Sequence, residues 1–288
     1  MDDIRIKILV ACHKPFSLPN NEQYFPIQVG KSGASMDLGI QGDDEGDNIS
    51  EKNYCYCELT ALYWAWKNLK DVDIIGLCHY RRYFDFHKQG LCFMPDTTFP
   101  ISSINELDFS LDRELLNDIL CGRIVIPKAI PWNCSLKQQY CEGHLSDDFK
   151  TLQKVVFETQ KEKYKNAFKE VLVKGYKFSP YNMMVMRWDD FDCYCSWLFD
   201  ILNKVEELVD ISHYSPYQKR IFGFMSEYLQ NVWLYAEKKQ ILECPVVFID
   251  ENCNKKFSRR FAPRKMMRLI NNRICCAFIS YFYRKTLR

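Results

Sequence analysis

Short apolar segments alternate along the chain with longer segments in which apolar residues recur every three or four positions. The apolar segments, each short enough for a β-strand, are residues 4–14, 73–80, 123–129, 178–186 and 241–250. A recurrence of three or four positions is typical of a helix with one buried face. Strands that alternate with helices predict an α/β protein with a mainly parallel sheet.

Helices are predicted between these strands. Ser50 is suited to cap the first of them. Its apolar face consists of Cys55, Leu59, Leu62, Trp66 and Leu69. The others are expected over residues 146–173, from Asp189 or Asp190 to 209, and over 217–238. Residues 15–50, which end in the Gly-, Asp-, Asn- and Ser-rich stretch GKSGASMDLGIQGDDEGDNIS, are expected to form a long loop, and long loops in compact domains are often functional.

One predicted strand ends in a group of polar and aromatic side chains. The stretch IIGLCHYRRYF, residues 74–84, leads from a buried run into His79, Arg81 and Arg82. In an open α/β sheet, ligands bind beyond the carboxyl ends of the strands. A guanidinium group can pair with two phosphate oxygens at once. We therefore expect this strand end to bind a diphosphate, the alternative being an ordinary solvent-exposed strand end.

The net charge of +2 conceals an uneven distribution. Residues 255–288 hold eleven Lys or Arg and no acid, which leaves 28 basic against 37 acidic residues before them. The apolar run ICCAFISYF in this segment has nine residues, fewer than the ~20 that span a bilayer. We expect residues 251–288 to form a basic amphipathic tail on an anionic membrane surface. The alternative is that its apolar residues pack on the preceding domain.

The 14 cysteines lie mostly within apolar patterns and include no CxxC pair. The N-terminal sequence is too charged, and its apolar run too short, for a signal peptide. Both features are typical of a protein of the reducing cytosol, in which cysteines act as small buried hydrophobic residues.

Two acidic groups are candidate sites for a divalent cation such as Mg²⁺ or Mn²⁺. The loop QGDDEGDN brings Asp43, Asp44 and Asp47 close together, and carboxylate oxygens suit these ions. Asp85 and His87, in the sequence FDFH, resemble a degenerate Asp-x-Asp pair. The loop aspartates could instead accept hydrogen bonds from ribose or sugar hydroxyls, or belong to a flexible polar loop.

Two stretches offer a general base. CEGHLSDDF places His144 near Asp147 and Asp148 at a predicted helix start, where simple capping is the alternative. Glu227 has apolar neighbours on both sides, and burial would raise its pKa toward that of a useful base. The alternative for Glu227 is a solvent-facing helical glutamate.

Four blocks of the chain resemble a bacterial family catalogued as domain of unknown function 4422. They are CELTALYWAWKN, DIIGLCHYRRYF, NMMVMRWDDFDCYCSWLFDIL and RIFGFMSEYLQNVWL, and the block HYRRYF is the most specific. Members of this family occur in capsular and exopolysaccharide gene clusters. They are described as glycosyltransferases, some of them as galactofuranosyltransferases.

The resemblance implies a GT-A-like fold in which residues 1–250 form one Rossmann-type glycosyltransferase domain. It implies a nucleotide-sugar donor, with a UDP-sugar expected, and a saccharide or lipid-linked saccharide acceptor. Galactofuranose is one candidate for the transferred sugar. The enzyme would work in the cytoplasm, at the inner face of the membrane. The chain lacks a clean Asp-x-Asp, which leaves metal dependence open, and inversion or retention is open as well.

The resemblance also suggests residue roles. His79, Arg81 and Arg82 would neutralise the diphosphate leaving group. The nucleotide would lie over the first strand and the acidic loop, with contacts from the loop residues Asp44, Asp47 and Asn48.

On the acceptor side, Glu227 or Asp147 would deprotonate the acceptor hydroxyl in an inverting reaction. His144 and Asn182 would bind sugar hydroxyls.

Two other classes of protein are less favoured. A nucleotidyltransferase of similar fold usually has a glycine-rich loop after the first strand, whereas this chain has ACHKPFSLPN. A nucleic-acid-binding protein usually spreads basic charge over its fold, whereas residues before 255 are acidic on balance. The chain also contains no P-loop, GxGxxG or GxSxG motif.

Overall fold

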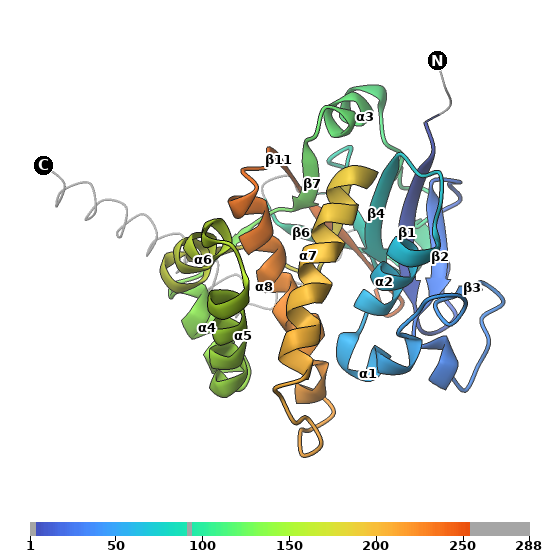
Figure 1. The fold of residues 1–288 in the computed structure, drawn as a ribbon. Helices are drawn as coiled ribbons and strands as arrows, with labels where there is room; N and C mark the ends of the chain where they lie inside the picture. Colours follow the sequence, from blue (N-terminus) through green and yellow to red (C-terminus); the bar gives the residue numbers. More distant parts are fainter. Residues whose placement is uncertain (1–3, 91–93, 254–288) are drawn as a thin grey trace, which may run out of the picture.

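The computed structural model describes residues 4–90 and 94–253 (Figure 1). Within these ranges ten strands form one mixed, mostly parallel sheet, in which β11, β7, β10, β4, β1, β2 and β3 follow one another, and β5, β12 and β6 continue from β4. Its strands are β1 (Ile6–Cys12), β2 (Tyr24–Gln28), β3 (Gln41–Gly42), β4 (Ile74–His79), β5 (Arg82–Phe84), β6 (Asp96–Pro100), β7 (Ile124–Pro127), β10 (Met184–Arg187), β11 (Ile241–Cys244) and β12 (Val246–Asp250). The predicted α/β class is confirmed.

Helices cover the sheet, with α7 and α8 side by side in front of it and α4, α5 and α6 beside α8 in Figure 1. The helices are α1 (Asn53–Tyr56), α2 (Leu59–Asn68), α3 (Arg113–Leu120), α4 (Leu136–Gly143), α5 (Ser146–Thr159), α6 (Glu162–Phe168), α7 (Trp188–Glu206) and α8 (Ile221–Ala236). A small separate pair is formed by β8 (Ile130–Pro131) and β9 (Lys177–Phe178). Among the described residues no helix is both long and apolar enough to cross a bilayer.

The central strands are buried on both faces because their side chains alternate between two cores. In β4, Ile75 and Leu77 pack into the core under α2, α7 and α8, whereas Ile74 and Cys78 pack into the core on the other face. This alternation follows from the period of two residues in a strand. It places His79, two residues after Leu77, on the helix-covered face.

β10 is antiparallel to both of its neighbours, β4 and β7. The other central contacts, β1 with β2 and β1 with β4, are parallel. As a result β1 and β4 end at the same edge of the sheet, and the turn that leads into β10 lies at that edge too. These chain ends build the candidate site.

The single helix expected after Ser50 is divided. A 3₁₀ turn (Ser50–Lys52) leads into the short α1, and α2 follows only after a break at Cys57 and Glu58. Ser50 does not cap a helix; its hydroxyl bonds the buried carboxylate of Asp43 and accepts the N–H of Ser32 at 3.2 Å. The acidic loop is therefore hydrogen-bonded to the start of the helical segment that begins at Ser50.

Other predicted elements are interrupted as well. The segment 241–250 forms two strands, because Pro245 lacks an N–H: β11 pairs with β7, and β12 pairs with β5 and β6. The segment 146–173 forms α5, α6 and a π-helical turn (Lys169–Lys174). The proposed basic tail, apart from residues 251–253, lies outside the described residues.

Candidate active site

A cavity of about 1120 Å³ opens at the sheet edge where β1 and β4 end. Its lining residues come from these two strand ends, from β5 and β12, from the break between α1 and α2, from the turn before β10, and from the start of α8. This is the place at which open α/β sheets bind ligands.

Arg82 lies in the wall of this cavity without an acidic partner. β4 and β5 form a tight hairpin in which Arg82 pairs with His79. Its guanidinium lies over the rings of Tyr181 and Phe248, with 5.0 and 5.3 Å from Cζ to the ring centroids. Its buried Nε has no hydrogen-bond partner, and no carboxylate of the described residues lies within 4.0 Å of it. A guanidinium held by rings and left without a counter-ion is suited to bind an anion.

Two further arginines line the same cavity. Arg81, at the hairpin turn, is exposed and lies 5.0 Å from the ring centroid of Tyr80. Arg220, just before α8, donates from Nε to Cys57 Sγ at 3.3 Å. Neither forms an ion pair with a carboxylate in the part of the chain that the structure describes. Three guanidinium groups around one cavity favour a polyanionic ligand such as a diphosphate.

Glu227, in the second turn of α8, is the cavity's candidate base. Its Oε2 accepts a hydrogen bond from the backbone N–H of Tyr181 at 3.1 Å. Burial raises the pKa of Glu227 to about 7, and the negative charge of Glu58 acts in the same direction, while the Tyr181 N–H, Arg82 and Arg220 oppose the rise. A carboxyl group with a pKa near neutrality can take up a proton at physiological pH.

His79 holds the same stretch of backbone. Its Nε2 lies 2.8 Å from the carbonyl oxygen of Tyr181. Because a carbonyl oxygen can only accept, Nε2 must carry the hydrogen. Burial lowers the pKa of His79 below its ordinary value, so the imidazole is mostly neutral at pH 7. The positive charge of the cavity therefore comes from the arginines, and His79 orients the turn before β10.

Glu58 also lines the cavity, at the break between α1 and α2. Its Oε1 accepts a hydrogen bond from Asn182 Nδ2 at 2.7 Å. Asn182 is buried, donates to the carbonyl of Gly223 at 3.2 Å and accepts from Ser226 Oγ at 2.9 Å. The sequence predicts that Asn182 binds sugar hydroxyls. In the structure both of its amide hydrogens are already bonded within the protein, and the contact with sugar hydroxyls stays a prediction.

Strained backbone surrounds the cavity. Cys57, Tyr181 and Asn182 have φ values of 53°, 81° and 54°. Asn adopts this left-handed region readily, whereas Cys and Tyr do so at a cost of about 1–3 kcal/mol. Such strain persists only where contacts hold it in place, as Glu227 and His79 do at Tyr181.

Cys57 is not a candidate nucleophile, although it lies in the cavity wall. Burial raises the pKa of its thiol to about 12. The thiol is therefore protonated at neutral pH, and thiolate chemistry is disfavoured.

The acidic-loop residues Asp44, Asp47 and Asn48 are not among the residues that line this cavity. Asp47 accepts a hydrogen bond from the hydroxyl of Tyr63 at 3.1 Å, and Asn48 donates to the carbonyl of Asp44 at 3.0 Å. Their contact with the donor stays a prediction.

His144 and Asp147 are not among the lining residues either. Asp147 is exposed and pairs with Lys150 at 2.7 Å. His144 stacks on Phe224 with 4.1 Å between ring centroids. Their roles as base and acceptor ligand stay predictions.

Asp85 and His87, the candidate metal pair, each have hydrogen-bond partners within the protein, and their metal binding stays a prediction. The two carboxylate oxygens of buried Asp85 accept the N–H groups of Gln89 and Gly90 at 2.7 and 2.8 Å. His87 is directed to the carbonyl of Ser110 at 3.0 Å. Over residues 4–90 and 94–253, no group of three or more His, Cys, Asp or Glu side chains is arranged to hold a metal ion.

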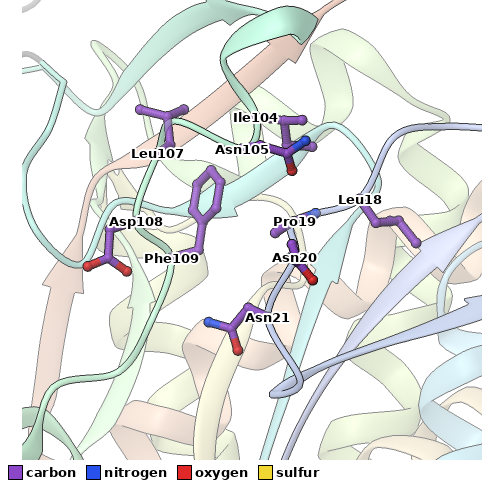
Figure 2. A pocket seen from close by; sticks show the side chains of 9 residues that line it. All are labelled: Leu18, Pro19, Asn20, Asn21, Ile104, Asn105, Leu107, Asp108 and Phe109. Carbon is purple, nitrogen blue, oxygen red and sulfur yellow. The ribbon is translucent and has the colours of Figure 1, made fainter.

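A second cavity, of about 640 Å³, lies between the loop after β1 and the segment after β6 (Figure 2). Its lining residues are Leu18, Pro19, Asn20, Asn21, Ile104, Asn105, Leu107, Asp108 and Phe109. Figure 2 shows amide side chains on both walls, Asn20 and Asn21 on one and Asn105 on the other. Because neither Lys nor Arg lines it, the first cavity is the candidate for an anionic ligand.

Fold and site together define an α/β protein with an arginine-lined, carboxylate-containing cavity at the carboxyl edge of its sheet. The family model described as Domain of unknown function (DUF4422) matches residues 7–239. The chain therefore belongs to that family, as its sequence blocks predicted.

Among solved structures, the chain is similar to the apo structure of the bifunctional glycosyltransferase WbbM, with a TM-score of 0.75 and 28% sequence identity. The similarity covers 90% of this chain and 48% of the WbbM chain. The chain thus spans about half the length of that enzyme. No curated protein matches it by sequence.

Sequence patterns missed Glu58 and His13 as cavity residues. Glu58 appeared to be one more polar residue in a continuous helix, and no Gly or Pro marks the break before it. His13 directly follows β1, which is the one signal that could have identified it.

Proposed function

We propose that this chain is a glycosyltransferase, which transfers a sugar from a nucleoside-diphosphate donor to a saccharide hydroxyl. Its family and its similarity to WbbM support the class of reaction. The observation that carries the proposal is Arg82, a guanidinium without a counter-ion that shares one cavity with the carboxylate of Glu227.

The proposed division of labour follows from charge. Arg82, Arg81 and Arg220 bind the diphosphate, whose negative charge grows as the bond to the sugar breaks. Glu227 lies beside them, with a pKa close to the pH at which it must act.

In an inverting reaction, Glu227 takes the proton of the acceptor hydroxyl. The acceptor oxygen forms a bond to the anomeric carbon, and the bond from that carbon to the phosphate oxygen breaks. The bonding electrons leave with the nucleoside diphosphate, next to the arginines.

The family supports finer proposals. We propose a UDP-sugar as donor, with galactofuranose as one candidate sugar, and a growing capsular or exopolysaccharide unit as acceptor. A lipid-linked acceptor would suit the eleven basic residues of 255–288, which favour an anionic membrane surface.

The experiment is UDP binding by calorimetry, followed by a screen of donor hydrolysis over a panel of nucleotide-sugars. Arg82→Ala should weaken UDP binding about 10- to 100-fold, the effect of losing a hydrogen bond to a charged group. Arg123→Ala is the matched control, because Arg123 pairs with Asp118 at 3.0 Å away from the cavity. Wild-type UDP affinity in both Arg82→Ala and Arg81→Ala would refute this donor site.

A further inference from the structure

Two carboxylates in the cavity are anchored on consecutive residues. Glu227 Oε2 accepts the N–H of Tyr181, and Glu58 Oε1 accepts from the side chain of Asn182. The two glutamates come from different elements, α8 and the break before α2. One turn of backbone therefore sets the position of both.

The anchor of Glu58 is rigid. Asn182 is buried, its φ of 54° lies in the left-handed region, and its amide bonds Gly223 and Ser226 of α8 as well. A side chain with every polar group engaged has little freedom to move. Glu58 is consequently held by one oxygen in a fixed place.

The second oxygen of each carboxylate is not hydrogen-bonded within the described residues. Only Oε2 of Glu227 and only Oε1 of Glu58 have a hydrogen-bond partner among the described residues, and neither carboxylate forms an ion pair within 4.0 Å there. Both residues line the cavity. Each can therefore accept one more hydrogen bond from a bound molecule.

The charge of the cavity limits what that molecule can be. A carboxylate repels a phosphate, and the arginines already suit the diphosphate. A sugar hydroxyl can donate to a carboxylate without a charge conflict. Two carboxylate oxygens positioned by one turn suit two hydroxyls of the same sugar ring.

We propose that Glu58 binds the acceptor sugar: it accepts a hydrogen bond from a second hydroxyl of the ring whose attacking hydroxyl faces Glu227. This inference rests on the proposed function and adds to it a residue that specifies the acceptor. The charge of Glu58 also favours protonation of Glu227, while Arg82 from β5 and Arg220 before α8 oppose it, and the neighbouring His79 of β4 is mostly neutral at pH 7.

The test uses the full chain, the UDP-sugar selected by the donor screen, and a panel of octyl hexopyranosides as acceptors. Glu58→Gln keeps the oxygen that accepts from Asn182 but removes the charge. Acceptor KM should rise about 10- to 100-fold, and the UDP Kd should stay within about twofold of wild type. With Glu227 as the base, kcat/KM of the wild type should fall as the pH drops below about 7. In Glu58→Gln this fall, the acid limb of the profile, should occur at lower pH.

Glu58→Asp separates charge from reach. It keeps the negative charge, so the acid limb should stay near the wild-type position, while the shorter side chain should still raise the acceptor KM. If Glu58→Gln fails to fold, as its thermal midpoint would show, Glu58→Asp carries the test. Glu206→Gln is the control, because Glu206 bonds Lys52 and Tyr56 and does not line the cavity.

The outcomes are distinct. An acceptor KM within about twofold of wild type in both Glu58 variants would overturn the proposal. A rise in the donor KM or the UDP Kd instead would place Glu58 on the donor and overturn it equally. A wild-type chain that neither binds UDP nor transfers sugar would refute the proposed function itself.

Discussion

Glu227 and His79 hold the backbone of Tyr181 from its two sides. Glu227 Oε2 accepts its N–H at 3.1 Å, and His79 Nε2 donates to its C=O at 2.8 Å. Glu227 belongs to α8 and His79 ends β4, so the candidate base is coupled to the strand end that carries the arginines. Displacement of either side chain would remove a contact that holds Tyr181 at its strained φ of 81°.

Replacing the base should separate chemistry from binding. Glu227→Gln preserves the shape of the side chain but cannot take a proton. Transfer should fall by about 10²- to 10⁴-fold, the usual contribution of a general base, while calorimetry finds UDP binding intact. In the wild type, kcat/KM should rise with pH and level off above about 7. Undiminished transfer in the variant would direct the search to Asp147 or Asp148.

Glu227 should also make stability depend on pH. Its folded pKa of about 7 lies above the ordinary value of 4.5. The folded state therefore binds more protons than the unfolded state between these values, and stability falls as pH rises through that window. The loss reaches at most about 3 kcal/mol above pH 7. Thermal melts of Glu227→Gln should lack this decline, and a parallel decline in variant and wild type would contradict the assignment.

Much of the fold could be predicted from local sequence. The run IIGLCH formed β4 and ended at the predicted site, because a strand buried on both faces needs a continuous apolar run. Local sequence could not predict whether neighbouring strands pair in parallel or antiparallel. Nothing in Met184–Arg187 distinguishes an antiparallel β10 from a parallel strand, since its partners β4 and β7 are distant in sequence.

The site could be predicted only in part. Arg82 and Glu227 carried a signal, as charged groups next to apolar runs. Glu58 carried none, because its place depends on the positive φ of Cys57, which tertiary contacts impose. The composition of the acidic loop suggested that its carboxylates bind a ligand. In the structure, buried Asp43 accepts hydrogen bonds from the backbone N–H groups of Gly30 and Lys31.

Metal dependence is testable directly. We expect transfer to persist in excess EDTA, because Arg81, Arg82 and Arg220 supply positive charge where the diphosphate departs. Initial rates with and without chelator, after removal of adventitious ions, check this. Complete loss of activity that Mn²⁺ or Mg²⁺ restores would overturn this expectation and show that a cation is needed, as it would be if Asp85 and His87 or the loop aspartates hold one.

The close approach of α8 to the break before α2 depends on Gly223. A Cβ at this position would lie 3.0 Å from Cys57 Sγ and 3.1 Å from Cys57 Cβ. Because Arg220 bonds that sulfur, the cysteine cannot move freely. Gly223→Ala should therefore destabilise the protein by about 1–3 kcal/mol and lower transfer.

Adding Cys57→Gly to this variant should restore part of the stability, since it removes the clashing atoms and relieves the positive φ at position 57. Gly143→Ala is the matched control, because a Cβ there meets nothing within 4 Å. Chemical denaturation of the two single variants, the double variant and the control measures the coupling directly. If residues 57 and 223 are in contact, the double-mutant cycle should give an interaction energy of about 1 kcal/mol or more. If the two substitutions instead change the free energy of unfolding by strictly additive amounts, other contacts hold the helix break.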